Sequence, residues 1–132
     1  MLRNAITTTL ICISFGIASI AAAADKHGHD HDHKPLHGGI VAEAAGLDFE
    51  LVAKADSLTL FIVDDGKPVT TAGAKGTATV FAGSEKIAAT LEPTGENKLV
   101  AKGGFKVGVG VRVAVVVTLA GKPEAKLNFR LK

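Results

Sequence analysis

Imidazole side chains are concentrated at one place in this 132-residue chain, and they carry its clearest chemistry. All five histidines lie between positions 27 and 37, and residues 38–132 contain none. Most of the cluster alternates, with aspartates between the later histidines: His27, His29, Asp30, His31, Asp32 and His33. Histidine is the commonest protein ligand for late first-row transition metals, and histidine-rich tracts are typical of metal binding. The composition therefore predicts a site for a divalent metal ion.

The spacing of these histidines suits a shared ion. Alternate side chains of an extended segment lie on one face about 7 Å apart. Two imidazoles at that spacing can converge on one ion at roughly 2.0–2.1 Å each, and Gly28 lets the segment wrap to bring in further ligands. Asp30 and Asp32 supply oxygen ligands or lower the net charge. The segment has no cysteine or methionine, which disfavours Cu(I) and leaves Cu(II), Ni(II), Zn(II) and Co(II).

Residues 1–24 have the pattern of a secretory signal peptide. Arg3 gives a short positive start, Ala5–Ile20 is mostly apolar, and Ala21–Ala24 offers small residues at the cleavage positions. An uncleaved membrane anchor is the alternative, because the apolar run is about long enough to span a bilayer. Its threonines and its abrupt small-residue end favour cleavage. We therefore expect an exported protein that consists of residues 25–132 and has no membrane segment.

Cleavage after Ala24 would create a second kind of metal site. The new N-terminus would read Asp25-Lys26-His27, with a free amine at position one and an imidazole at position three. The amine, two deprotonated backbone amides and the imidazole can surround a square-planar ion, which points to Cu(II) or Ni(II). Cleavage one residue away destroys this site and leaves the rest of the cluster intact, and the alanine run allows several cleavage positions.

His37 stands apart from the other histidines, directly before Gly38 and Gly39. It is a candidate ligand that ties the metal of the tail to the folded domain, with Glu43 or Glu50 nearby. A capping or turn residue is the alternative role. The whole histidine cluster also has an alternative interpretation, as a solvated leader whose imidazoles only titrate.

The charge balance and the residue types exclude several functions. Without Arg3, 14 lysines and arginines face 13 acidic residues, a formal charge of +1, which gives no reason to expect nucleic acid or an anionic membrane as partner. An enzyme needs a nucleophile, a base and an orienting group. Beyond residue 37 the chain has no histidine or cysteine, and its only serines are Ser57 and Ser84, near predicted turns. We therefore predict a protein without catalytic activity.

The exported chain divides into a histidine tail, residues 25–35, which we expect to be disordered, and a β-domain, residues 36–132. Alternating apolar residues and regular turn signals predict an all-β fold, a small antiparallel β-sandwich (Ig-like) or barrel of seven or eight strands. The expected strands are Ile40–Ala44, Asp48–Lys54, Leu58–Val63, Thr77–Ala82, Lys86–Glu92, Lys98–Lys102, Val107–Leu119 and Ala125–Leu131.

Two segments of the domain have patterns that a simple strand or turn does not fully describe. Every odd position of Val107–Leu119 is apolar, which predicts one long strand with a bend or bulge at Gly108 or Gly110. Asp64 and Asp65 before a glycine suggest a calcium ligand pair, but a hairpin turn explains them better, because a calcium loop needs a longer ligand series.

Three motifs carry a resemblance to a known family: His37-Gly38-Gly39, the Phe49–Val52 strand and the Asp65–Val69 turn. Over residues 36–132 the chain resembles the small periplasmic histidine-rich β-domain proteins associated with heavy-metal efflux, and the leading domain of some adaptor subunits of heavy-metal resistance-nodulation-division pumps. The resemblance implies a periplasmic location, a role in metal tolerance, and an efflux adaptor or pump component as partner. The chain lacks the long helical hairpin and the lipoyl-like segment of a full adaptor.

Overall fold

The computed structural model describes residues 34–132, and within them all regular structure is β-strand. The strands are β1 (Ile40–Ala44), β2 (Leu47–Ala53), β3 (Ser57–Asp64), β4 (Lys67–Pro68), β5 (Lys75–Ala82), β6 (Glu85–Pro93), β7 (Lys98–Lys102), β8 (Arg112–Thr118) and β9 (Ala125–Arg130). Every strand pair is antiparallel. The all-β prediction is confirmed. Over the described range, no helix is long and apolar enough to cross a membrane.

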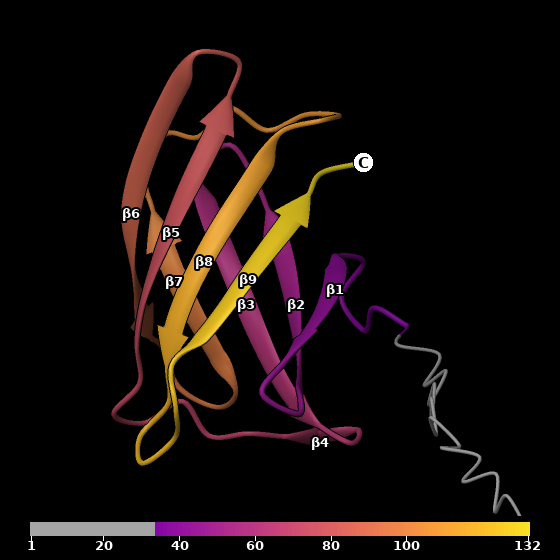
Figure 1. The fold of residues 1–132 in the computed structure, drawn as a ribbon, viewed down its shortest axis with the longest axis vertical. Helices are drawn as coiled ribbons and strands as arrows, with labels where there is room; N and C mark the ends of the chain where they lie inside the picture. The colour runs from indigo at the N-terminus through magenta and orange to yellow at the C-terminus, as the bar shows by residue number, and fades with distance from the viewer. Residues whose placement is uncertain (1–33) are drawn as a thin grey trace, which may run out of the picture.

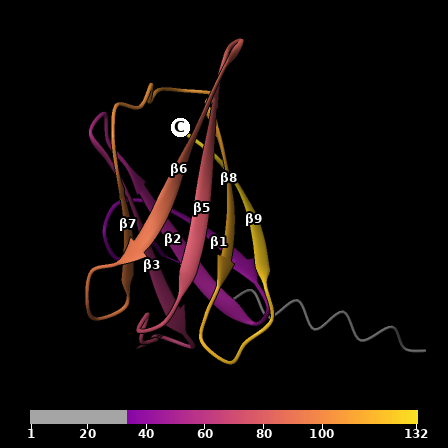
Figure 2. The ribbon, with the colours of Figure 1, turned by 90° about the vertical axis from the view of Figure 1, so that its left-hand side faces the viewer.

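The strands form one sheet that bends back on itself. Its order is β1-β2-β3-β7-β6-β5-β8-β9, with β4 added to β3. Strands β7, β3, β2 and β1 form a first layer, and β6, β5, β8 and β9 form a second layer in front of it (Figure 1). On one side Glu92 and Pro93 of β6 pair with β7, and on the other side β1 lies against β9 (Figure 2). The result is an antiparallel sheet nearly closed into a barrel.

The core fills the space between the two layers. Successive side chains of a strand point to opposite faces, so alternate residues of each strand face inward. The first layer contributes Phe49, Leu51, Leu58, Leu60, Ile62 and Leu99, and the second contributes Ala78, Val80, Val113, Val115, Val117, Leu127 and Phe129. This core stabilises the domain without a disulfide.

The long strand predicted over Val107–Leu119 is wrong at its beginning, because β8 starts only at Arg112. Gly110 has a φ of +87°, a conformation that ends an extended strand, and the Val111 N–H donates to the Gly108 carbonyl at 3.2 Å. Val109 is 87% exposed on the resulting loop. Apolar alternation continues through this segment, but glycines at the alternate positions let the backbone turn away from the sheet.

The other strands lie close to their predicted positions. Ile40–Ala44 and Lys98–Lys102 form strands with the predicted bounds. The turn predicted around Asp64 and Asp65 joins β3 to β4, a short strand that was not predicted. Two longer connections, residues 69–74 and 103–111, cross between the layers at opposite ends of the barrel (Figure 1).

Candidate functional site

The site lies on the outer face of the first layer, where β2 presents Glu50 between two inward residues, Phe49 and Leu51. The strand register places Glu50 directly beside Val41 of β1 and Phe61 of β3. Glu50 points away from the core, yet its side chain is only 6% exposed. The segment that precedes β1 covers it.

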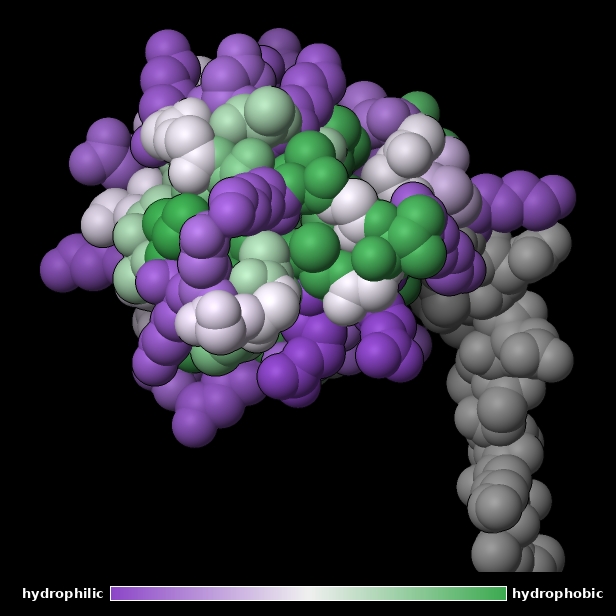
Figure 3. All heavy atoms as spheres, turned by 90° about the horizontal axis from the view of Figure 1, so that it is seen from above, coloured by the Kyte–Doolittle hydropathy of each residue, from purple (hydrophilic) through white to green (hydrophobic). Residues whose placement is uncertain are grey.

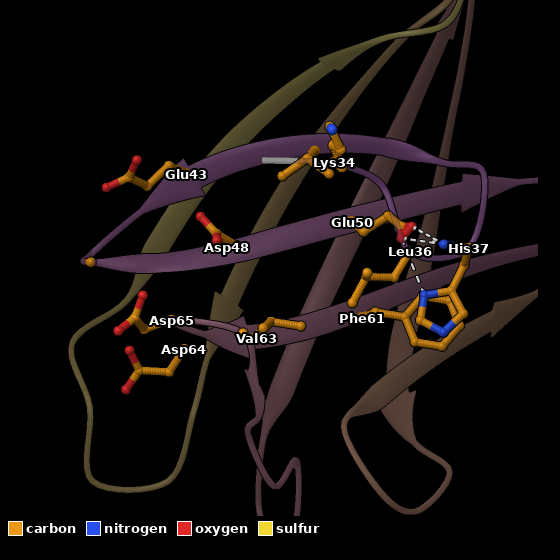
Figure 4. A pocket seen from close by; sticks show the side chains of 13 residues that line it. Lys34, Leu36, His37, Glu43, Asp48, Glu50, Phe61, Val63, Asp64 and Asp65 are labelled. Atoms are coloured by element: carbon orange, nitrogen blue, oxygen red, sulfur yellow. Dashed lines mark hydrogen bonds and ion pairs between the residues drawn. The ribbon is translucent and has the colours of Figure 1, made fainter. Parts of the chain in front are cut away.

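His37 binds Glu50 through its backbone and its ring (Figure 4). The His37 N–H lies 2.8 Å from each carboxylate oxygen of Glu50 and donates to both. The His37 Nδ1 atom lies 3.1 Å from Oε1 of the same carboxylate. These contacts satisfy the buried carboxylate, and across residues 34–132 no buried side-chain nitrogen or oxygen lacks a hydrogen-bond partner.

The His37 ring also stacks on Phe61. The two ring centroids are 3.7 Å apart and the rings are nearly parallel, with 4° between their planes. Since Phe61 and Glu50 are cross-strand neighbours, one imidazole reaches both. The two contacts together fix the position and the tilt of the ring.

Gly38 and Gly39 allow the chain to approach the sheet closely enough for these contacts. Gly38 has a φ of +73°. At Gly39 an added Cβ would lie 2.4 Å from the Leu51 carbonyl oxygen and 2.9 Å from Cγ of Glu50, closer than real Cβ atoms come. The His-Gly-Gly sequence thus positions the imidazole over Glu50 and Phe61.

The contact with Glu50 determines which ring nitrogen of His37 is free to act as a ligand. A carboxylate only accepts hydrogen bonds, so Nδ1 carries the proton that it donates. In the neutral ring Nε2 then has a lone pair, and the His37 side chain is 42% exposed. Metal-binding histidines almost always donate their other N–H to a carboxylate or carbonyl in this way. The geometry therefore suits His37 to one metal bond through Nε2.

A shallow hollow of about 580 Å³ extends from His37 along β1 and β2 to the β3–β4 turn. It is lined by Lys34, Leu36, His37, Val41, Glu43, Gly46, Asp48, Glu50, Phe61, Val63, Asp64, Asp65 and Gly66. Apolar side chains form part of its floor, and carboxylates lie along its length and at the end away from His37 (Figure 4). Five acidic residues against one lysine give the lining a formal charge of −4.

The predicted metal ligands fall into two groups. Asp25, His27, His29, Asp30, His31, Asp32 and His33 lie outside the described residues, as do the predicted signal peptide and its cleavage position. His37 is described, with Glu50 as its partner, while Glu43 lies elsewhere in the hollow. Considering residues 34–132 alone, no three His, Cys, Asp or Glu side chains are grouped so that they could hold a metal ion. His37 would thus need ligands from beyond this range.

The stacking partner of His37 was not predicted from the sequence. Phe61 belongs to a strand with apolar residues on both faces, a pattern typical of a central strand. β3 is central, between β2 and β7, but its outer face is covered by the histidine segment at this point. A glutamate between two inward residues is ordinary for a solvated face, so the outward Phe61 was the available signal that something covers this face.

The motifs behind the family resemblance gather in this hollow: His37, Glu50, Asp65 and Gly66 all line it. Comparison of the chain with protein-family models, curated protein sequences and solved structures finds no match.

Proposed function

We propose that this is an exported, periplasmic metal-binding protein without catalytic activity, which captures or buffers Cu(II), Ni(II), Zn(II) or Co(II) in metal tolerance or efflux. The histidine tail supplies most of the ligands: Asp25, His27, His29, Asp30, His31, Asp32 and His33. His37 adds one ligand from the folded domain. A metal-efflux adaptor or pump component is the candidate partner.

The observation that carries this proposal is the state of His37. Its ring is held by a buried carboxylate and an aromatic ring, and its Nε2 atom is left as the available donor. Such an arrangement is typical of a metal ligand supported by a carboxylate. Since only three residues separate it from His33, the ligand is continuous with the cluster of the tail.

Calorimetric titration of residues 25–132 with Cu(II), Ni(II) and Zn(II) tests the proposal. We expect at least one ion to bind, and replacement of His27, His29, His31 and His33 by glutamine to weaken binding by about 100-fold or more, because too few neutral nitrogen donors remain. Affinity should fall as the pH drops through roughly 6.5, where imidazoles protonate. The matched control is Asp30→Asn with Asp32→Asn, which keeps every imidazole and should change affinity far less.

Unchanged binding in the four-histidine variant would refute the role of the tail. The variant His37→Gln separates the two parts of the site: we expect a several-fold loss of affinity with the tail still binding. An intact mass of the exported protein fixes its first residue, and so decides whether His27 stands at position three.

A second candidate function is a protein-interaction module in which the tail is incidental. It is favoured by the end of the barrel that carries the 103–111 connection, where hydrophobic side chains gather on the surface (Figure 3). Val109 is 87% and Val107 37% exposed, and Val107 lines a second hollow of about 480 Å³ together with Leu131 and Val52. Exposed apolar residues next to a hollow are typical of a contact surface.

The two candidate functions predict opposite results for metal tolerance of the organism that makes the protein. A metal-binding tail requires that tolerance is lost without Asp25–His33 and kept in Val109→Ser. An interaction module requires that tolerance does not depend on Asp25–His33.

A further inference from the structure

The acidic hollow begins where the histidine tail joins the domain. Lys34 and Leu36 lie on its rim, and the residue before Lys34 is the last histidine of the alternating cluster. Residues 25–33, if extended, would span on the order of 30 Å. That exceeds the roughly 16 Å of a five-residue strand such as β1, so the tail is long enough to fold back along the whole hollow.

Metal binding changes the charge of the tail but not the charge of the hollow. Residues 25–33 contain three aspartates and one lysine, a formal charge of −2, or −1 with the amine that cleavage after Ala24 would free. The hollow carries −4 with Glu43, Asp48, Asp64 and Asp65 along its length. The metal-free tail is therefore repelled by the hollow. Each divalent ion bound through neutral imidazoles adds two positive charges, so one ion takes the tail from −2 to 0, or from −1 to +1. The first ion therefore removes the repulsion, and any further charge turns it into attraction.

We propose that metal binding docks the tail: the loaded segment 25–33 lies in the hollow on β1, β2 and β3, and the empty segment does not. This deepens the metal-binding function proposed above and rests on it. His37 is the fixed point from which the ion-carrying segment enters. The carboxylates farther along hold the loaded tail by charge.

The geometry of the hollow agrees with a docking role rather than an independent metal site. Residues 34–132 bring no three potential ligands together, so the hollow has no chelating group of its own. Its apolar floor, which includes Val41, Phe61 and Val63, would be covered by the docked segment. Domain and tail would then each supply what the other lacks: the tail supplies the ion, and the domain supplies the complementary charge.

Nuclear magnetic resonance of residues 25–132 with one equivalent of Cu(II) tests the proposal, because the paramagnetic ion broadens the signals of nearby amides. We expect strong broadening at the far end of the hollow, at Asp48, Val63 and Gly66. Val107 and Gly108 are the internal comparison, since they line the second hollow, which has no acidic side chain in its lining, and should be affected much less.

The variant Asp48→Asn, Asp64→Asn, Asp65→Asn removes three charges from the hollow and leaves every histidine in place. We expect the amides of the acidic hollow to be broadened no more than those of Val107 and Gly108, and the dissociation constant for Cu(II) to rise about three- to tenfold. In 0.5 M NaCl the unmodified chain should behave in the same way, because salt screens the attraction. The matched control Asp56→Asn, Glu92→Gln, Glu124→Gln removes three exposed carboxylates outside the hollow and should change neither result by more than about twofold.

Cu(II) that binds the chain but broadens both hollows equally would overturn the docking and leave the metal-binding function standing. The docking is also overturned if the variant without the three aspartates keeps the full affinity for Cu(II) and the full difference in broadening between the two hollows. Absence of Cu(II), Ni(II) and Zn(II) binding in calorimetry would overturn both proposals together.

Discussion

Two phenylalanines project from opposite faces of the barrel, and they are covered in different ways. Phe61 of β3 points out of the first layer, and Phe81 of β5 points out of the second. Both are half-buried. Phe61 is covered by the stacked ring of His37 at 3.7 Å, whereas the charged groups of Arg112 and Lys86 lie 5.4 and 5.8 Å from the centroid of Phe81.

The cover of Phe81 follows from strand register alone. Lys86 of β6 and Arg112 of β8 are its direct cross-strand partners, so their side chains reach the ring without any further ordering of the chain. Cation–π contacts of this kind at exposed sites contribute about 0.5–1 kcal/mol. An outward aromatic ring on this barrel can thus be shielded by its neighbours in the sheet.

The cover of Phe61 needs much more. A segment outside the sheet must be ordered, two glycines must bring it close to β2, and a glutamate must be buried to bind it. Ordering each residue costs about 1–2 kcal/mol of backbone entropy. Shielding a ring does not require this, as Phe81 illustrates. We therefore attribute the arrangement to the fixed imidazole, in agreement with its proposed role as a metal ligand.

The largest expected effect on stability comes from filling the space between Gly39 and β2. Gly39→Ala places a methyl group 2.4 Å from the Leu51 carbonyl oxygen, so β1 must shift from β2. We expect a loss of about 3 kcal/mol in the free energy of unfolding, measured by urea denaturation. Gly104→Ala is the control, because an added Cβ there has no neighbour within 4 Å, and its unfolding free energy should change by less than about 1 kcal/mol. Equal losses in both variants would mean that the close approach is not what stabilises this face.

A smaller loss of stability is expected when the carboxylate of Glu50 is replaced. Glu50→Gln keeps the shape of the side chain but turns one of its acceptors into a donor that faces the His37 N–H groups. We expect a loss of about 1.5 kcal/mol in unfolding free energy, against less than about 0.5 kcal/mol for the exposed control Glu92→Gln.

The same variant tests how the imidazole is oriented. Nitrogen chemical shifts of the His37 ring should indicate a proton on Nδ1 in the unmodified chain and a mixture of tautomers in Glu50→Gln. A loss of stability without any change in the ring would assign Glu50 a purely structural role.

The contrast between the two faces also explains what the sequence could predict. Alternation of apolar residues identified eight of the nine strands and the all-β class, because inward positions repeat with period two. It misplaced the beginning of β8, where alternation continues over a loop. The environment of Phe81 depends on which strands pair, and that of Phe61 depends on a chain segment that crosses the sheet. Both are long-range contacts, for which a single sequence gives residue types but not partners.

The smallest expected effect concerns the second layer, where Arg112 and Arg130 lie directly opposite each other on β8 and β9. Like charges in this position destabilise a sheet, and Arg130 has no ion pair within residues 34–132 to offset the repulsion. Arg130→Gln should therefore raise the unfolding free energy by about 0.3 kcal/mol at low salt, and the gain should vanish in 0.5 M NaCl. Lys126→Gln is the control, because Lys126 lies opposite Val116 and close to Glu124, so its removal should bring no gain. If Arg130→Gln instead lowers the unfolding free energy, the arginine pair contributes packing that outweighs its repulsion, and the outer face of the second layer, like the face around His37, depends on specific side-chain contacts.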